Sequence, residues 1–90
     1  MRLNFNETNV LIQSINDLVK YNKPVNKSSL INMLDELSQN TDTNHLFLHQ
    51  SIKTLISKIE MLSDDIVNKI YEDVQNDRII ATACYQMPQH

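Results

Sequence analysis

The chain has 90 residues and a formal net charge of −3 at pH 7, and it contains no glycine and one cysteine. Its length corresponds to one small domain. Its 41% apolar and 21% charged residues are typical of a folded chain rather than a disordered one. A single cysteine excludes an internal disulfide, and the acidic balance argues against a dedicated nucleic-acid binder.

The sequence shows no signal for a membrane or for secretion. It has no run of about 18 apolar residues, so no membrane span is expected. Residues 1–9 lack the apolar stretch of a signal peptide. We therefore expect a cytoplasmic protein.

Apolar residues recur at helical spacing over residues 7–21, which predicts a first helix. They are Leu11, Ile12, Ile15, Leu18 and Val19. Asn6 or Thr8 is expected to cap its start. Pro24 disfavours helical geometry in the residue before it, so the helix must end near Asn22. In a chain without glycine, Asn22 is the residue best suited to the left-handed conformation at a helix end.

Two further helices are predicted. Asn26 is expected to cap the second, which runs to about Ser38 with apolar residues at Leu30, Ile31, Met33, Leu34 and Leu37. After a polar connector, Thr41 or Asp42 is expected to cap a third helix that reaches residue 62. Its apolar residues are Leu46, Phe47, Leu48, Ile52, Leu55, Ile56, Ile59 and Leu62. We expect this helix to be the centre of the core.

Ser63, followed by two aspartates, is typical of a new helix start and predicts a fourth helix. Its apolar residues are Ile66, Val67, Ile70, Tyr71 and Val74. It ends near Asn76, or near residue 80 if Ile79 and Ile80 extend it. The alternative is that the third helix runs through Ser63, because no proline or glycine forces a break.

The predicted fold is an all-α bundle of three to four amphipathic helices. We expect one domain over residues 1–85, with residues 86–90 as a frayed tail. The first three helices lie within about 7–62, and the fourth helix spans about 63–80.

Few residues form a pattern typical of catalysis or metal binding. His45 and His49 lie four apart, a spacing that can ligate zinc, but a third ligand is missing because Asp42 is better used as a cap. We interpret both histidines as surface residues. Cys84 has no base beside it in sequence, so burial as a small apolar side chain is expected. No enzymatic activity, metal or cofactor is predicted.

Candidate contact residues lie on the third helix and at the first turn. The apolar arc of the third helix is wider than one packing contact requires, so part of it is expected to face a second copy. The interface candidates are Phe47, Ile52, Leu55, Ile59 and Leu62. For Met33, Phe47 and Tyr71, core packing is the first expectation and an interface role the alternative. Lys20, Lys23 and Lys27 cluster at the turn, which we interpret as a solvated loop rather than a phosphate site.

Residues 11–59 carry an ordered pattern. A first helix presents Leu11, Ile15 and Leu18, and a turn with Lys23 leads to Val25-Asn26-Lys27. A second helix begins with Leu30-Ile31 and ends on Leu34 and Leu37, and Thr41-Asp42 precedes a third amphipathic helix. In this pattern the chain resembles the YmgB/AriR-type biofilm and acid-resistance regulators, small enterobacterial proteins with YcgZ and YmgA as relatives. It departs from them in having Tyr21-Asn22-Lys23 where their turn usually has a glycine, and in the additional residues 63–90.

The resemblance implies an all-α homodimer without enzymatic activity. It implies a connector that contacts a signalling system of the Rcs phosphorelay type and so affects biofilm, capsule and acid-stress genes. Some members are also associated with DNA, and a dimer of this chain would pool Lys20, Lys23, Lys27 and Lys53. A further alternative is an anti-sigma or phage-type inhibitor that binds its target through the C-terminal helix.

Overall fold

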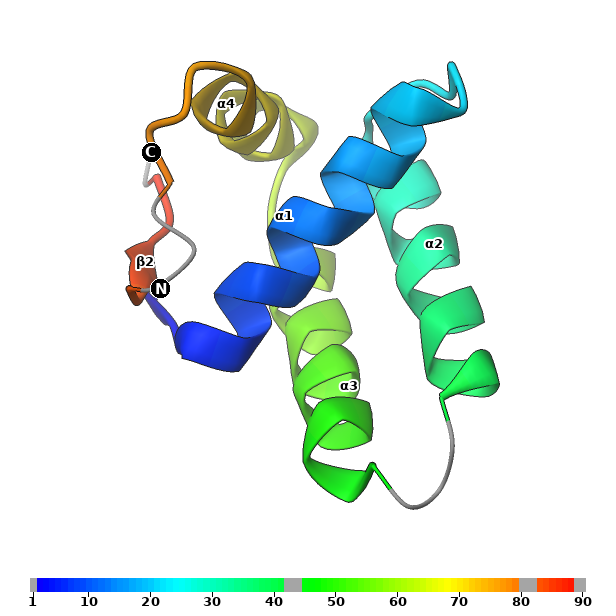
Figure 1. Cartoon of the computed structure of the whole chain (residues 1–90). Coiled ribbons are helices and arrows are strands. Elements are labelled where there is room, and N and C mark those ends of the chain that lie inside the picture. Colours follow the sequence, from blue (N-terminus) through cyan, green and yellow to red (C-terminus); the bar gives the residue numbers. More distant parts are fainter. Residues whose placement is uncertain (1, 42–44, 80–82, 89–90) are drawn as a thin grey trace.

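The computed structural model describes residues 2–41, 45–79 and 83–88 (Figure 1). The elements are β1 (Arg2–Leu3), α1 (Phe5–Lys20), α2 (Lys27–Asn40), α3 (Leu46–Glu60), α4 (Asp64–Gln75) and β2 (Tyr85–Gln86). The predicted all-α bundle is confirmed, with a short pair of strands that the sequence analysis did not predict. No helix in the described part of the chain is long and apolar enough to cross a bilayer.

Helix α1 begins at Phe5, earlier than predicted, because Asn4 forms a capping box with Glu7. The Asn4 side-chain oxygen accepts the Glu7 backbone N–H at 2.8 Å, and the Asn4 N–H donates to Glu7 Oε1 at 2.9 Å. The prediction that Asn6 or Thr8 caps this helix is therefore wrong. Thr8 instead donates its hydroxyl to the Asn4 carbonyl at 2.7 Å.

Helix α1 ends as the sequence predicted, with Asn22 in the left-handed region at φ 56°. The Lys23 N–H donates to the Leu18 carbonyl at 2.9 Å, and the Asn22 N–H donates to the Val19 carbonyl at 3.1 Å. These two bonds form a Schellman motif, which usually requires glycine at the left-handed position. Asn26 then caps α2 by accepting the Ser29 N–H at 2.9 Å, and this prediction is also confirmed.

The conformation of Asn22 leads to a stability prediction. Replacing Asn22 with glycine is expected to leave the free energy of unfolding unchanged or to raise it, because glycine adopts positive φ without Cβ strain. Asn22→Val is expected to lower it by about 1 kcal/mol or more. Urea denaturation of the two variants is the measurement. Equal stability of the valine and glycine variants would contradict this account of the turn.

The predicted break between α3 and α4 is confirmed. Ser63 caps α4 by accepting the Ile66 N–H at 3.3 Å, and two acidic residues occupy the first turn. An extension of this helix to about residue 80 is wrong. Asp77 adopts φ 54°, and the Arg78 N–H donates to the Asp73 carbonyl at 2.8 Å, so the chain turns away after Gln75.

The start of α3 differs from the prediction. Thr41 does not cap it, because its hydroxyl donates back to the Leu37 carbonyl at the end of α2. His45 occupies the N-cap position and makes no side-chain capping bond. Asp42, the other predicted cap, lies outside the described residues.

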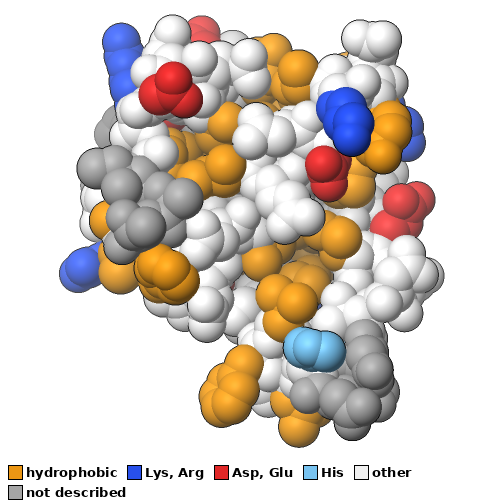
Figure 2. All heavy atoms as spheres, in the orientation of Figure 1, with side chains coloured by type: hydrophobic (Ala, Val, Ile, Leu, Met, Phe, Trp, Pro, Cys, Tyr) orange, Lys and Arg blue, Asp and Glu red, His pale blue; other side chains and the backbone are white. Residues whose placement is uncertain are grey.

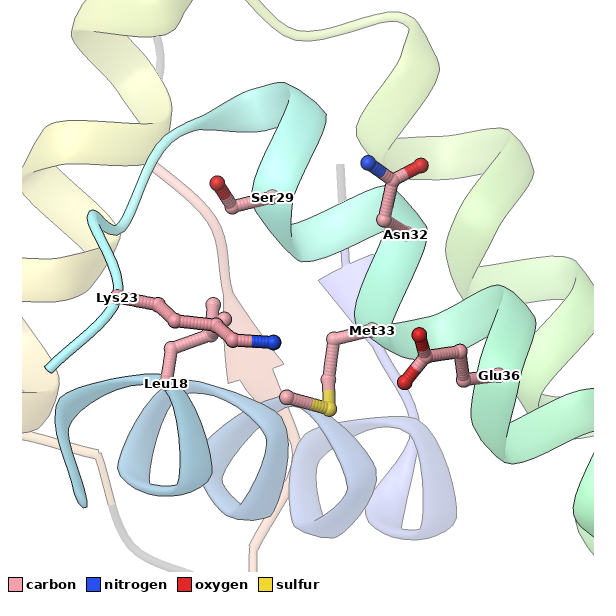
Figure 3. A pocket seen from close by; sticks show the side chains of 6 residues that line it. All are labelled: Leu18, Lys23, Ser29, Asn32, Met33 and Glu36. Atoms are coloured by element: carbon pink, nitrogen blue, oxygen red, sulfur yellow. The ribbon is translucent and has the colours of Figure 1, made fainter. Parts of the chain in front are cut away.

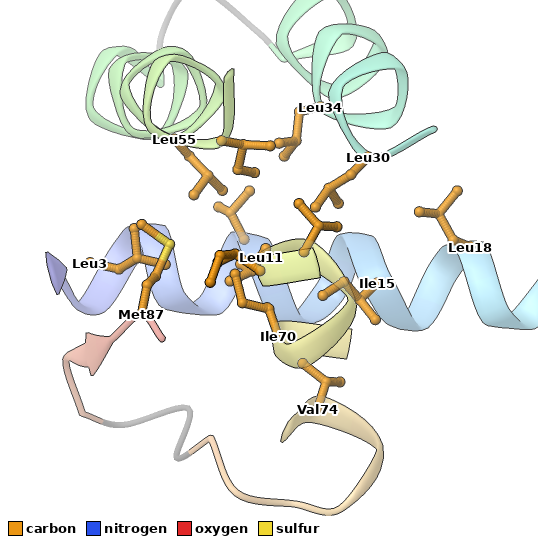
Figure 4. Close-up of a cluster of buried hydrophobic side chains, with 14 of the residues drawn as sticks. Leu3, Leu11, Ile15, Leu18, Leu30, Leu34, Leu55, Ile70, Val74 and Met87 are labelled. Atoms are coloured by element: carbon orange, nitrogen blue, oxygen red, sulfur yellow. The ribbon is translucent and has the colours of Figure 1, made fainter. Parts of the chain in front are cut away.

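The hydrophobic core is centred on α1 rather than on α3. Figure 1 shows α1 lying across the other helices, and it contacts α2, α3, α4 and β1. Figure 4 shows side chains from all these elements converging in one cluster. Its buried members are Leu3, Val10, Leu11, Ile15, Leu18, Leu30, Leu34, Ile52, Leu55, Ile59, Ile66, Val67, Ile70, Val74 and Met87. Helix α4 contributes Ile66, Val67, Ile70 and Val74 to this core.

The two ends of the described chain pair with each other. Strand β1 runs antiparallel to β2, with Leu3 opposite Tyr85. Met87 follows the strand and is buried beside Leu3 (Figure 4). Tyr85 donates its hydroxyl to Asp73 at 2.7 Å, and burial together with this bond raises the pKa of the tyrosine well above its usual range. The expected frayed tail is therefore wrong for residues 86–88, and residues 89–90 lie outside the described residues.

Candidate interaction surface

Most of the predicted interface residues on α3 lie inside the single chain. Ile52, Leu55 and Ile59 belong to the buried core, and Leu62 packs against it. The wide apolar arc of α3 predicts contact with a second copy. In the structure both α1 and α2 pack against α3, so two contacts within one chain cover most of the arc. Only Phe47 among the five candidates is largely exposed.

The first turn of α3 carries an exposed apolar surface, the Leu46–Leu48 patch. Leu46, Phe47 and Leu48 are 65%, 84% and 41% exposed. The prediction that Phe47 packs in the core is therefore wrong. Figure 2 shows hydrophobic side chains gathered at this end of the molecule, near a histidine. Exposed apolar side chains that lie together are typical of interaction sites.

A hollow of about 320 Å³ lies at the patch. Its lining comes from Asn6 of α1 and from His45, Leu46, Phe47 and Leu48 at the start of α3. None of these residues is a lysine, arginine, aspartate or glutamate, so an apolar group could enter without removing a full charge from water. The geometry is that of a shallow contact surface with one protruding aromatic ring.

The two histidines on this side of the molecule lie at the start of α3. His45 is exposed at the N-cap, whereas His49 is half-buried with its Nδ1 3.4 Å from the Ser38 hydroxyl. In residues 2–41, 45–79 and 83–88, no group of three or more His, Cys, Asp or Glu side chains could hold a metal ion.

The three lysines near the first turn differ in their surroundings. Lys20 places its Nζ 5.8 Å from the centre of the Tyr21 ring, a cation–π arrangement. Lys23 lines a small hollow of about 110 Å³ together with Glu36, with Met33 between them (Figure 3). Lys27, the third candidate, is the first residue of α2 and is half-buried. The acidic residue Glu36 therefore lies at the same hollow as Lys23, one of the three lysines.

A wider groove lies between the first turn and α4, with a volume of about 540 Å³. Its lining residues are Val19, Asn22, Lys23, Pro24, Val25, Asn68 and Tyr71. Sequence reasoning gave Asn22 and Pro24 only a role in the turn, and no sequence signal indicated that α4 comes close to them. Met33 and Tyr71 are partly buried against the core, as expected.

Comparisons with protein-family models, with curated proteins and with solved structures found no match for this chain. The resemblance to the YmgB/AriR-type regulators therefore stays a prediction.

Proposed function

We propose that this chain is a small non-enzymatic regulatory protein that acts by binding other proteins, with the Leu46–Leu48 patch as its contact surface. The observation that carries this proposal is the 84% exposure of Phe47. Most of the aliphatic side chains on the helices pack in the core of the domain. A small domain has few apolar residues to spare. Leaving a phenylalanine between two leucines in solvent is costly unless a partner covers them.

The first proposed partner is a second copy of the chain. Phe47 protrudes beside a hollow that it helps to line, so a two-fold axis would bring the ring of each copy to the hollow of the other. A two-fold interface places the same patch on both copies, so identical side chains can face each other across it and must not repel. A lining without charged residues meets that condition.

The second proposed partner is a signalling protein. The resemblance of residues 11–59 to the YmgB/AriR-type family supports a cytoplasmic connector to a phosphorelay of the Rcs type, with effects on biofilm formation and the acid-stress response. A DNA-associated role has less support, because the net charge is −3 and Glu36 shares the hollow of Lys23. An inhibitor that grips its target through the C-terminal helix also has less support, since the aliphatic side chains of α4 are buried in the core.

We expect Phe47→Glu to weaken self-association by about tenfold or more, because the variant loses an apolar contact and places a charge at the centre of the interface. The measurement is light scattering coupled to size exclusion over a concentration series. Helical circular dichroism should stay unchanged, since Phe47 contributes little to the core.

Thr54→Glu is the matched control, because Thr54 is exposed on the same helix and lies outside the patch. It should leave self-association unchanged. A wild-type protein that is monomeric at every concentration would refute the homodimer. If the wild-type monomer and the Phe47→Glu variant then bind a signalling partner equally well, the Leu46–Leu48 patch is not the contact surface.

A further inference from the structure

A cavity of about 210 Å³ lies where β1, the start of α1, the end of α3 and the residue before β2 meet. It is lined by Arg2, Leu3, Asn4, Glu7, Lys58 and Cys84. It is separate from the Leu46–Leu48 patch, and the proposed function does not use it.

Glu7 is the unusual residue of this cavity, because its carboxylate is 1% exposed and only half satisfied. Its Oε1 accepts the Asn4 N–H at 2.9 Å and the Lys58 ammonium at 3.0 Å. Its Oε2 is buried and has no hydrogen-bond partner among the described residues. Buried carboxylate oxygens are normally paired, and an unpaired one is costly. The cavity that Glu7 lines is a place from which a bound molecule could supply the missing donor.

Two cationic residues line the same cavity. Lys58 also donates to the Arg2 carbonyl at 3.1 Å, which fixes its ammonium at the wall. Arg2 is the second, and it is exposed. One unsatisfied acceptor beside two cations matches an amino-acid zwitterion, whose ammonium donates and whose carboxylate accepts.

Cys84 adds a reactive group to this arrangement. It is exposed, contrary to the burial expected from the sequence, and its thiol is free. As the only cysteine of the chain it cannot form an internal disulfide, so it can pair only with a thiol from another molecule.

We propose that Cys84 is a modification site that forms a mixed disulfide with small disulfides whose halves are amino-acid zwitterions. The Cys84 thiol gives its proton to solvent, and the thiolate attacks one sulfur of the incoming disulfide. A new sulfur–sulfur bond forms while the original one breaks. The departing half leaves as a thiolate that takes up a proton, so no external oxidant is needed. Arg2 and Lys58 hold the carboxylate of the bound half, and Glu7 accepts from its ammonium.

The test compares three disulfides with the full chain: cystine, whose halves are amino-acid zwitterions, the dication cystamine, and the neutral bis(2-hydroxyethyl) disulfide. Intact mass measured over time gives the rate of adduct formation, and each rate is divided by that of the same disulfide with the neutral thiol N-acetylcysteine amide. We expect the normalised rate for cystine to exceed the other two by roughly threefold or more, the size of effect that a few partly exposed charges produce. Cys84→Ser should abolish the adduct.

Variants show whether the cavity causes this preference. Arg2→Gln and Glu7→Gln should each remove most of it, and Arg2→Gln keeps the backbone carbonyl that Lys58 uses. Arg78→Gln is the matched control, because it removes the same charge at an arginine outside the cavity, and it should keep the preference. Helical circular dichroism confirms that each variant is folded. Equal normalised rates for the three disulfides, a faster reaction with cystamine, or a preference that survives Arg2→Gln would overturn the proposal.

Discussion

Ile59→Glu is expected to unfold the chain rather than to release a folded monomer from a dimer. Ile59 is 0% exposed and lies in the core with residues from α1 and α4. The substitution removes about 1.5–3 kcal/mol of apolar burial. It also places a carboxylate without a partner in the core, which costs several kcal/mol more. Small domains have only about 5–15 kcal/mol of net stability, so the variant should lose its cooperative thermal transition.

Circular dichroism during heating measures this effect. Thr54→Glu, which adds the same charge on the exposed face of α3, is the control and should melt close to the wild type. A cooperative melt of Ile59→Glu near the wild-type temperature would show that Ile59 is not a core residue. Phe47→Glu on the same helix should stay folded, so the pair of variants separates the core of α3 from its contact surface.

Met87→Ala is expected to lower the free energy of unfolding by about 2–5 kcal/mol, the usual cost of truncating a buried methionine. Met87 is 1% exposed and packs in the core beside Leu3, although it lies next to the last described residue. The substitution would leave a void between the short sheet and the helices. Urea denaturation measures the loss.

Gln86→Ala is the matched control, because Gln86 is the exposed neighbour in β2. Its effect should stay within about 0.5 kcal/mol, as for most surface substitutions. If Met87→Ala and Gln86→Ala have the same small effect, the C-terminal segment does not pack on the core in solution, and the original expectation of a frayed tail would be restored.

Local chemistry determined where three of the helix limits lie. Asn22 ends α1, Asn26 begins α2 and Ser63 begins α4, and each position was predicted from the sequence. These signals are readable because a cap or a left-handed residue acts on backbone groups within a few positions of itself. Asn4 was missed, although it lies three residues before Glu7 in the pattern of a capping box.

The candidate contact surface was predicted only in part. Phe47 was among the named interface candidates, but so were Ile52, Leu55 and Ile59, which the core buries. All of them are apolar residues on one helix, and the helical period alone does not separate them. The cavity at Cys84 was not predicted at all, because its residues come from distant parts of the chain.

The sequence by itself determined the helices, their limits near the turns and the absence of a disulfide, since these depend on interactions between neighbours in the chain. Only the tertiary structure decided which apolar residues are covered. Ile59 is buried in the cluster to which all four helices contribute, whereas Phe47 on the same helix is left 84% exposed. The pairing of Leu3 with Tyr85 was equally beyond the sequence, because a two-residue strand has no period to detect. Its stability comes from contacts between the two ends of the chain.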